Sequence, residues 1–374
     1  MAARFKRLTK KIFVILNILA SVAFLLSCLA PYLNPKDWWL ISLLGLGFAF
    51  IIVTLIAFIF FWLFFKPKLI LLSLIPLLIG WKSISVFFGF NNPDSFDYDK
   101  PANNLRVISW NVGRFVEWKR NNNKGSQTRL KMMDLLKEQK ADVVCLQEFF
   151  QSKDSIYYDN LSHILKELDF PYYYFSWDND GYLQWVGQII LSKHPIVDSG
   201  IIRFPRPTIT ESLIHADILF NKDTVRFYTT HLQSVRFRKS DFEKIEDIKR
   251  TRDGMVQNSK NIFSKLKNGF VYRSSQAAIV KEIISNSPHP YILTGDFNDV
   301  PNSYTYFTIK GKELKDAFLE TSFGVGRTYS YIAPTLRIDY IFTTKDFSVN
   351  QFNRLLRNYS DHYMLVADVE LKKK

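Results

Sequence analysis

Three nearly uncharged apolar segments fill most of the first 90 residues of this 374-residue chain. They run over residues 12–33, 38–65 and 69–88. Each is close to or above the roughly 20 residues that an α-helix needs to cross a bilayer core. The first two lack the polar face of a helix on a soluble core, whereas the third contains Pro76, Gly80 and Lys82 and is either kinked or partly interfacial. The sequence therefore predicts a transmembrane region of about three helices over residues 1–90.

The charges that flank these segments predict their orientation. Lysine and arginine are retained on the cytoplasmic side of a membrane. Basic residues precede the first segment and separate the second from the third, namely Arg4, Lys6, Arg7, Lys10, Lys11, Lys66 and Lys68. We therefore expect a multi-pass protein of the inner cell membrane, with a cytoplasmic amino terminus and an extracytoplasmic domain beyond residue 91.

The same amino terminus admits another interpretation. A basic start before an apolar stretch is typical of a cleaved signal peptide, and residues 25–28 (LLSC) have the form of a bacterial lipobox that would lipidate Cys28. Two more apolar segments follow at once, which a secreted lipoprotein does not need, so we expect Cys28 to be an ordinary buried residue. The only other cysteine is Cys145. A disulfide framework is therefore excluded, and a hydrophobic core must stabilise the outer domain.

The charge of the chain bears on its partners. The formal net charge is +14, of which residues 101–374 carry +8. A basic domain favours anionic partners such as nucleic acid, phospholipid headgroups or phosphorylated metabolites, without selecting among them. Residues 91–104 are polar, contain two prolines and are expected to form a linker.

Beyond the linker, single polar residues stand where apolar, strand-like runs end. In residues 291–302 the apolar run breaks at Gly295 and presents Asp296 and Asn298 on one side, because side chains alternate faces along a strand. The alternative is turn chemistry, which uses Gly, Asn and Asp for backbone reasons alone. The other positions of this kind are Asn111, Glu148, His231, Asp339, Asp361 and His362.

The run over residues 141–146 is expected to be a buried strand that ends at Gln147 and Glu148. An acid in such an apolar setting needs a partner, and a divalent cation is one candidate. Strand-like and helical patterns recur through two successive halves of residues 105–374. This pattern suits two sheets packed face to face with helices outside them.

Six short motifs, in order along the chain, connect this domain to a known family. They are SWNV (109–112), LQE (146–148), THL (230–232), GDFN (295–298), IDYIF (338–342) and SDH (360–362). In them the chain resembles a membrane-anchored bacterial member of the endonuclease/exonuclease/phosphatase superfamily. These metal-dependent phosphoesterases include deoxyribonuclease I, apurinic endonucleases, neutral sphingomyelinases and inositol polyphosphate 5-phosphatases. The resemblance implies an α/β fold, a four-layer α/β/β/α sandwich over residues 105–374, and does not account for the apolar segments.

The resemblance also implies a metal site. Hydrolysis of a phosphodiester needs a water in line with the leaving oxygen, a base for that water, and positive charge beside phosphorus. Mg2+, with Mn2+ as the alternative, would be bound by Glu148 as the principal ligand. Asn111 would bind it directly or through water, and Asp361 would be a further ligand.

The catalytic roles follow from the same resemblance. Asp296 would orient or deprotonate the attacking water, and Asn298 would hold a phosphate oxygen. His362, oriented by Asp339, would donate to the phosphate. His231 would be a second phosphate donor or the acid for the leaving oxygen. Some relatives have a tyrosine there, and the histidine resembles the deoxyribonuclease and sphingomyelinase branches.

These observations predict a membrane-anchored, Mg2+-dependent phosphodiesterase that forms no covalent enzyme intermediate. One alternative is a headgroup hydrolase like phospholipase C or sphingomyelinase, in place of a nuclease. Another is a catalytically inactive binding module, which predicts missing site residues, whereas every expected polar position is filled.

Overall fold

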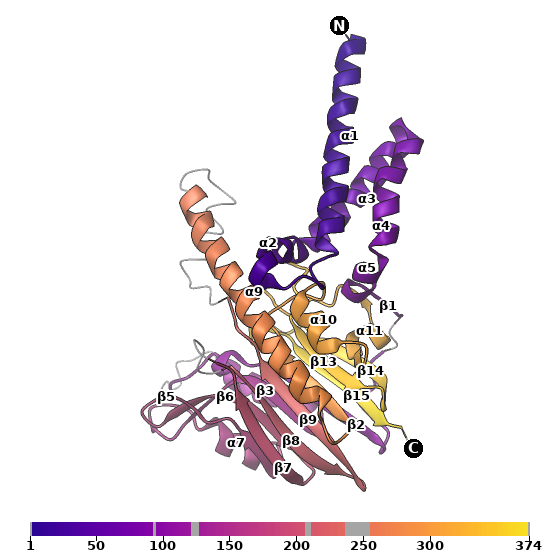
Figure 1. The fold of residues 1–374 in the computed structure, drawn as a ribbon. Coiled ribbons are helices and arrows are strands. Elements are labelled where there is room, and N and C mark those ends of the chain that lie inside the picture. The colour runs from indigo at the N-terminus through magenta and orange to yellow at the C-terminus, as the bar shows by residue number, and fades with distance from the viewer. Residues whose placement is uncertain (1, 93–94, 121–126, 206–210, 236–254, 373–374) are drawn as a thin grey trace. The chain divides into compact units, whose positions relative to one another are not determined.

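The computed structural model describes residues 2–92, 95–120, 127–205, 211–235 and 255–372, and these form two compact units (Figure 1). The helical unit comprises Met1–Phe87, Ser234–Ser275 and Asp299–Thr308. The sheet unit comprises Phe88–Gln233, Gln276–Asn298 and Ile309–Lys374. Two residues of the predicted linker, 93 and 94, lie outside the described residues.

The helical unit contains the apolar segments of the sequence. Within residues 1–87 its α-helices are α1 (Ala2–Ser27), α2 (Pro35–Leu46), α3 (Phe48–Phe65), α4 (Leu71–Ile79) and α5 (Trp81–Phe87). Among the described residues, Leu8–Ser27 and Phe48–Phe65 are helices long and apolar enough to cross a membrane. Pro67–Ile79 and Trp81–Phe87 give a third if this pair, bent by 66°, acts as one span. The segment expected over 38–65 is divided into α2 and α3 at Gly47, and the third segment bends at Gly80.

Neutral polar side chains connect three of these helices. Asn17 Nδ2 donates to Ser73 Oγ at 2.6 Å, and Trp62 Nε1 donates to Asn17 Oδ1 at 3.2 Å. Pro76 has no N–H to donate to the carbonyl of Leu72 one turn earlier. Ser21 Oγ of α1 donates to that carbonyl instead, at 2.7 Å. Hydrogen bonds therefore join α1 to both α3 and α4.

The sheet unit contains two large sheets. The first has the order β14 (Phe347–Leu355), β15 (Met364–Leu371), β2 (Asn104–Asn111), β3 (Val143–Ser152), β6 (Gln184–Ser192) and β4 (Tyr172–Phe175), with β5 (Asp178–Gly181) beside β6. The second has the order β11 (Leu314–Asp316), β13 (Asp339–Thr344), β10 (Tyr291–Asp296), β9 (Asp223–His231), β8 (Ser212–Phe220) and β7 (Ile196–Arg203). A separate short pair joins β1 (Gly89–Phe90) to β12 (Phe323–Gly324).

Alternate residues of the central strands fill two hydrophobic cores. Val107 of β2 packs between the sheets with Phe227 and Ile292, whereas its neighbour Ile108 packs on the other side with helices α6 (Thr128–Glu138) and α7 (Asn160–Glu167). This follows from the period of two along a strand. Burial of each such side chain contributes about 1.5–3 kcal/mol.

Helices also lie outside the second sheet. Helix α9 (Met255–Ser285) contributes its C-terminal part, from Gln276 on, to the sheet unit, where Ala277, Val280 and Ile284 are buried. Two short helices follow among the described residues, α10 (Tyr304–Lys310), most of which belongs to the helical unit, and α11 (Ala317–Thr321) of the sheet unit. The α/β fold with two facing sheets and outer helices, which the sequence predicted, is confirmed.

One strand differs from its prediction. Strand β3 does not end at Gln147 and Glu148 but continues to Ser152. Its pairing with β6 is interrupted between Leu146 and Phe149, where Glu148 has a φ of +50°. This β-bulge bends the strand and lets the pairing resume beyond it. Glu148 therefore lies at an irregularity within a strand.

Candidate active site

The strand register brings the polar residues of the second sheet together. Asp296, at the end of β10, pairs with His231 of the parallel strand β9 and with Asp339 of the antiparallel strand β13. Neighbouring strands lie about 4.7–4.9 Å apart, so the three residues form a row across the sheet. The three residues are far apart in the sequence, and the pairing of β9, β10 and β13 brings them together.

Gly295 makes this arrangement possible. Its φ is +142°, a conformation that favours glycine. A Cβ at this position would lie 2.0 Å from the backbone oxygen of Thr230 on β9. Any other residue would push β10 away from β9 just before Asp296.

Asn111 connects the two sheets. It ends β2 in the first sheet, and its Nδ2 donates to Glu148 Oε1 at 3.2 Å and to Asp296 Oδ2 at 3.1 Å. Its Oδ1 accepts from the backbone N–H of Gly113 at 3.1 Å, which fixes the amide. The side chain of Glu148 is 37% exposed and that of Asp296 is 1% exposed. One amide thus bonds both an open and a buried carboxylate.

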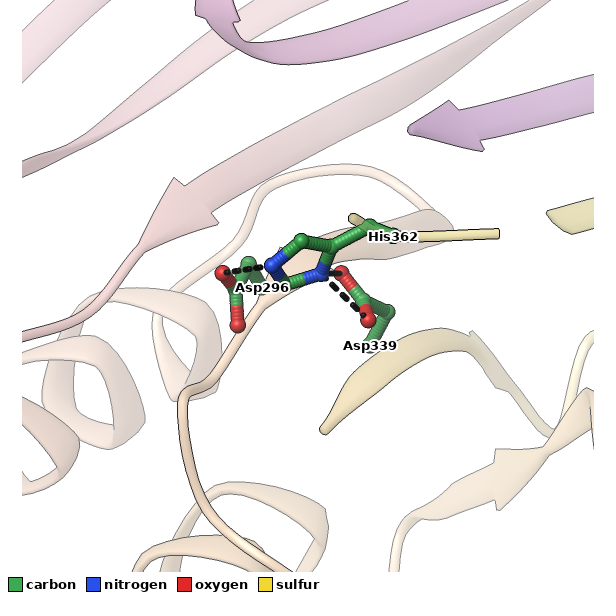
Figure 2. A group of neighbouring side chains, drawn as sticks. All are labelled: Asp296, Asp339 and His362. Carbon is green, nitrogen blue, oxygen red and sulfur yellow. Dashed lines mark hydrogen bonds and ion pairs between the residues drawn. The ribbon is translucent and has the colours of Figure 1, made fainter. Parts of the chain in front are cut away.

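His362 and Asp339 form a buried pair (Figure 2). His362 Nδ1 lies 3.0 and 2.9 Å from the two carboxylate oxygens of Asp339, and His362 Nε2 lies 3.7 Å from Asp296 Oδ2. Burial opposes the charged imidazolium, but the carboxylates of Asp339 and Asp296 outweigh it and raise the pKa of His362 well above its usual value. The ring is therefore held protonated, with Nε2 directed at Asp296.

Asp296 is the central carboxylate of the cluster. Burial and the neighbouring Asp339 raise its pKa to about 6, against the opposing effects of His362 and His231. Its Oδ1 accepts from the backbone N–H of Asn298 at 2.8 Å. An acid with a pKa near neutrality can exchange a proton at physiological pH.

Asn298 and His231 complete this edge of the sheet. Asn298 has a φ of +52°, and its Nδ2 lies 3.0 Å from the carbonyl oxygen of Leu232 and 3.2 Å from Asp296 Oδ2. His231 Nε2 lies 3.6 Å from Asp296 Oδ2 and 3.8 Å from Glu148 Oε1. This buried nitrogen has no hydrogen-bond partner within the described part of the chain, so it is oriented toward the cluster but unsatisfied.

Asp361 lies at the same strand end, beside Gly113. Its Oδ1 would lie 3.5 Å from a Cβ placed on Gly113. Gly113 is two residues after Asn111, so Asp361 lies near the end of β2. Ser360 Oγ donates to the carbonyl oxygen of Asn111 at 2.8 Å, which ties the SDH segment to the end of β2. All eight residues singled out in the sequence thus lie around one edge of the two sheets.

Asp296, Asp339 and His362 have ligand atoms within 4.8 Å of one another and form a group that could hold a metal ion. This group differs from the predicted ligands Glu148, Asn111 and Asp361. The atoms of Asp339 and His362 already satisfy each other, whereas Glu148 is partly open and shares the amide of Asn111 with Asp296. Oxygen donors of this kind suit a hard cation such as Mg2+. Glu148 therefore offers carboxylate oxygens to a divalent ion, whereas Asn111 directs its Nδ2 at Glu148 and its Oδ1 at the N–H of Gly113.

Sequence reasoning missed the contribution of Tyr329. Its ring packs edge-on against the His362 ring with centroids 5.0 Å apart, and the two residues form a β-bridge. Burial, with a further contribution from Asp361, raises the pKa of the Tyr329 hydroxyl. In the sequence, the only feature that pointed to Tyr329 was its position ten residues before Asp339. The bridge to His362 depends on the assembled fold.

Two family models match two separate parts of the chain. The model of the endonuclease/exonuclease/phosphatase family matches residues 108–362, which is more than half of the chain. A model described as a domain of unknown function (DUF8431) matches residues 10–87. No curated protein sequence matches.

Several solved structures resemble the chain. An endonuclease/exonuclease/phosphatase from Beutenbergia cavernae is 18% identical, with 72% of each chain covered and a TM-score of 0.49. One from Bacteroides vulgatus is 19% identical, with 72% of this chain and 99% of that chain covered and a TM-score of 0.49. The human Nocturnin catalytic domain with bound sulfate is 16% identical, with coverages of 72% and 95% and a TM-score of 0.49.

Proposed function

Because the chain belongs to the endonuclease/exonuclease/phosphatase family of phosphoesterases, we propose that it is a membrane-anchored, Mg2+-dependent phosphodiesterase that activates water for attack on phosphorus. The position of Asn111 carries this proposal. Its single amide bonds the carboxylates of Glu148 and Asp296 from two different sheets. A candidate metal ligand and a candidate base thus face the same small volume.

Glu148, Asn111 and Asp361 would hold the divalent cation. The family is dependent on divalent metals, and the acidic cluster is present in this chain. The neutral amide of Asn111 does not offset the negative charge of the Glu148 and Asp296 carboxylates that it bonds. A cation would stabilise both. When bound, the ion would supply the positive charge that offsets charge developing on the phosphate.

The remaining groups would handle the water and the phosphate. Asp296 would take a proton from the attacking water, a role that suits a pKa of about 6. Asn298 Nδ2 donates to Asp296 Oδ2 at 3.2 Å, and it would exchange this bond for one to a phosphate oxygen. No covalent intermediate is required, because none of these groups needs to attack phosphorus.

Two histidines would donate protons or hydrogen bonds to the substrate. His362 is held protonated by Asp339 and would donate through Nε2 to the phosphate. His231 Nε2 is buried without a hydrogen-bond partner among the described residues, as expected for a group that bonds a substrate. It would be a second phosphate donor or the acid for the leaving oxygen.

The helical unit would anchor the enzyme in the inner cell membrane. Large apolar side chains such as Val53 and Phe64 of α3 are 65% and 80% exposed, and lipid would cover them. With the basic amino terminus in the cytoplasm and three spans, the sheet unit would lie outside the cytoplasm. The substrate would then be an extracytoplasmic phosphodiester, either a polynucleotide or a phospholipid headgroup.

The proposal is tested on the purified full-length chain in detergent. We expect hydrolysis of bis(p-nitrophenyl) phosphate with Mg2+, no hydrolysis with EDTA, and recovery when Mg2+ is restored. Asp296→Asn should lower kcat by roughly a hundredfold to ten-thousandfold, since that is the usual contribution of a general base. The matched control is Asp99→Asn, because the Asp99 side chain is 93% exposed.

Activity that survives chelation would refute the metal dependence. An inactive wild-type chain that is folded would favour the inactive binding module. Comparing plasmid DNA with vesicles that contain sphingomyelin or other phospholipids would then separate the nuclease from the headgroup hydrolase.

A further inference from the structure

Two arginines of the sheet unit, Arg327 and Arg354, lie close to the candidate active site and have no role in the proposed mechanism. Arg354 is on β14 and pairs with Leu365 of β15, three residues after His362. Residues directly opposite each other on antiparallel strands share one face of the sheet, and Leu365 packs between the two sheets. Arg354 therefore lies on the face of the first sheet that is turned toward the second, and it is partly buried.

Arg327 connects Arg354 to the residues around His362. Its guanidinium donates to the carbonyl oxygen of Tyr329, from Nε at 2.7 Å, and to that of Ser330. Tyr329 is the residue whose ring packs against the His362 ring. Arg354 Nη1 donates to the carbonyl oxygen of Arg327 at 2.6 Å. Both arginines therefore lie beside the segment that contacts His362.

Positive charge exceeds negative charge around these two side chains. A third arginine, Arg337, pairs with Asp316 at 2.5 Å. Within the described part of the chain, the side chains of Arg327 and Arg354 bond only carbonyl oxygens and form no ion pair. Burial lowers the pKa of Arg354; Tyr363 opposes this effect, and the charges of Arg337 and Arg327 add to it. Such a charge calls for a counter-charge, because a buried charge is seldom left unpaired.

Arg354 also has a donor without an acceptor. Its Nε is buried and forms no hydrogen bond with the residues that the structure describes. A guanidinium carries five N–H donors in a planar fork that matches the oxygens of a phosphate. A buried donor that stays unpaired costs free energy. An oxyanion beside Arg327 and Arg354 would satisfy this donor and balance the charge at once.

From this cluster, and on the basis of the proposed function, we infer that Arg327 and Arg354 bind a phosphate group of the substrate other than the one that is hydrolysed. We call these two residues the second phosphate site. Sphingomyelin and phosphatidylcholine carry one phosphate, which the reaction itself would occupy. A polynucleotide carries a phosphate at every linkage, and arginine contacts to such phosphates position a strand on a protein. The second phosphate site therefore favours a polynucleotide over a phospholipid headgroup as the substrate.

The test compares two substrates of the full-length chain in detergent with Mg2+. Bis(p-nitrophenyl) phosphate has one phosphate group, and a single-stranded oligothymidylate has many. Arg327→Gln and Arg354→Gln should each raise the KM for the oligothymidylate by about tenfold to a hundredfold, the usual effect of a lost hydrogen bond to a charged group. The rise should be at least about tenfold larger than any rise for bis(p-nitrophenyl) phosphate, because only the longer substrate has a second phosphate.

Salt dependence separates a lost phosphate contact from a loosened segment. Fluorescence anisotropy of a labelled oligothymidylate in EDTA measures affinity without hydrolysis. Each phosphate contact to a single strand contributes about 0.7 to the slope of log affinity against log salt concentration. Arg354→Gln should therefore make this slope shallower by about 0.7, whereas Arg354→Lys keeps the charge and should retain the wild-type slope. A merely structural role would not change the slope.

Arg357→Gln is the matched control. Arg357 is exposed just beyond the end of β14, and its loss removes the same charge. The KM for both substrates and the salt slope should equal those of the wild type. If one of the two glutamine variants at the second phosphate site does not fold, the other decides in the same way.

Equal effects on the two substrates, with an unchanged salt slope, would overturn the second phosphate site and leave the proposed function intact. Inorganic phosphate provides a further outcome. If it raises the melting temperature of the wild type but not of Arg354→Gln, while both bind the oligothymidylate equally, the site holds a free phosphate and its role for the substrate is overturned. A wild-type chain that hydrolyses neither substrate would refute the proposed function, and the anisotropy in EDTA would then decide the second phosphate site by itself.

Discussion

The two halves of the candidate active site differ in how they hold their carboxylates. In the first sheet, Glu148 lies on a β-bulge, its side chain is 37% exposed, and it accepts a hydrogen bond from the neutral amide of Asn111. In the second sheet, the side chain of Asp339 is 2% exposed, and both its oxygens face the Nδ1 of His362. The first carboxylate is open, and the second is already paired.

This difference separates two kinds of chemistry. A carboxylate that is partly open can exchange water for a cation, which suits a metal ligand. A carboxylate buried against a histidine fixes the tautomer and charge of that ring. The proposed function accordingly gives metal binding to the first half and proton handling to the second, and the following experiments test that proposal.

The largest effect is expected at the paired carboxylate. Asp339→Asn removes the charge that keeps His362 protonated and leaves the ring without a fixed orientation. By analogy with other acid–histidine pairs, kcat should fall by roughly a thousandfold to ten-thousandfold. Because the wild-type pKa of His362 is raised, its protonated form persists to higher pH. In the variant the residual activity should therefore be lost at lower pH than in the wild type.

Kinetics over a range of pH check this prediction. Asp346→Asn is the control, because Asp346 is an exposed carboxylate in the turn that follows the same strand. If the alkaline side of the profile is unchanged in Asp339→Asn, His362 does not act as the protonated group.

The open carboxylate should respond to metal. Glu148→Gln keeps the shape of the side chain but weakens its bond to a cation. We expect the half-maximal Mg2+ concentration to rise by about tenfold to a hundredfold, with part of kcat regained at high Mg2+. Titration of activity with Mg2+ measures this. A rise in Asp339→Asn, with none in Glu148→Gln, would instead place the ion at Asp296, Asp339 and His362.

Sequence patterns predicted the strand-end residues because these depend on local alternation. Asn111 and Asp296 follow apolar runs, and the structure places both at strand ends, as expected. The bulge at Glu148 was missed because it depends on pairing with β6, more than 30 residues away. The same reason hid the contact of Tyr329 with His362 and the packing of residues 299–308 with the N-terminal helices. Each of these contacts joins residues far apart in the chain.

A smaller effect is expected at Tyr329, which belongs to the paired half through its contact with the His362 ring. Aromatic contacts of this kind contribute about 0.5–1.5 kcal/mol beyond burial. Tyr329→Ala should therefore lower kcat roughly threefold to tenfold, whereas Tyr329→Phe should retain nearly all of it. Steady-state kinetics of both variants check this. An equal loss in the two would show that the hydroxyl acts, and not the ring.

The last prediction concerns the stability of the metal-free protein. Burial beside Asp339 raises the pKa of Asp296 from 3.8 to about 6, so the folded state favours the protonated acid. That contribution is fully present below about pH 3.8 and is lost as the pH rises through 6. In EDTA, Asp296→Asn should therefore melt at the same temperature as the wild type near pH 4 and a few degrees higher above pH 6. Thermal unfolding at several pH values measures this difference in melting temperature. Glu148→Gln is the control. If its melting temperature differs from that of the wild type in the same pH-dependent way, the two halves do not differ, because loss of either carboxylate would then relieve the same repulsion.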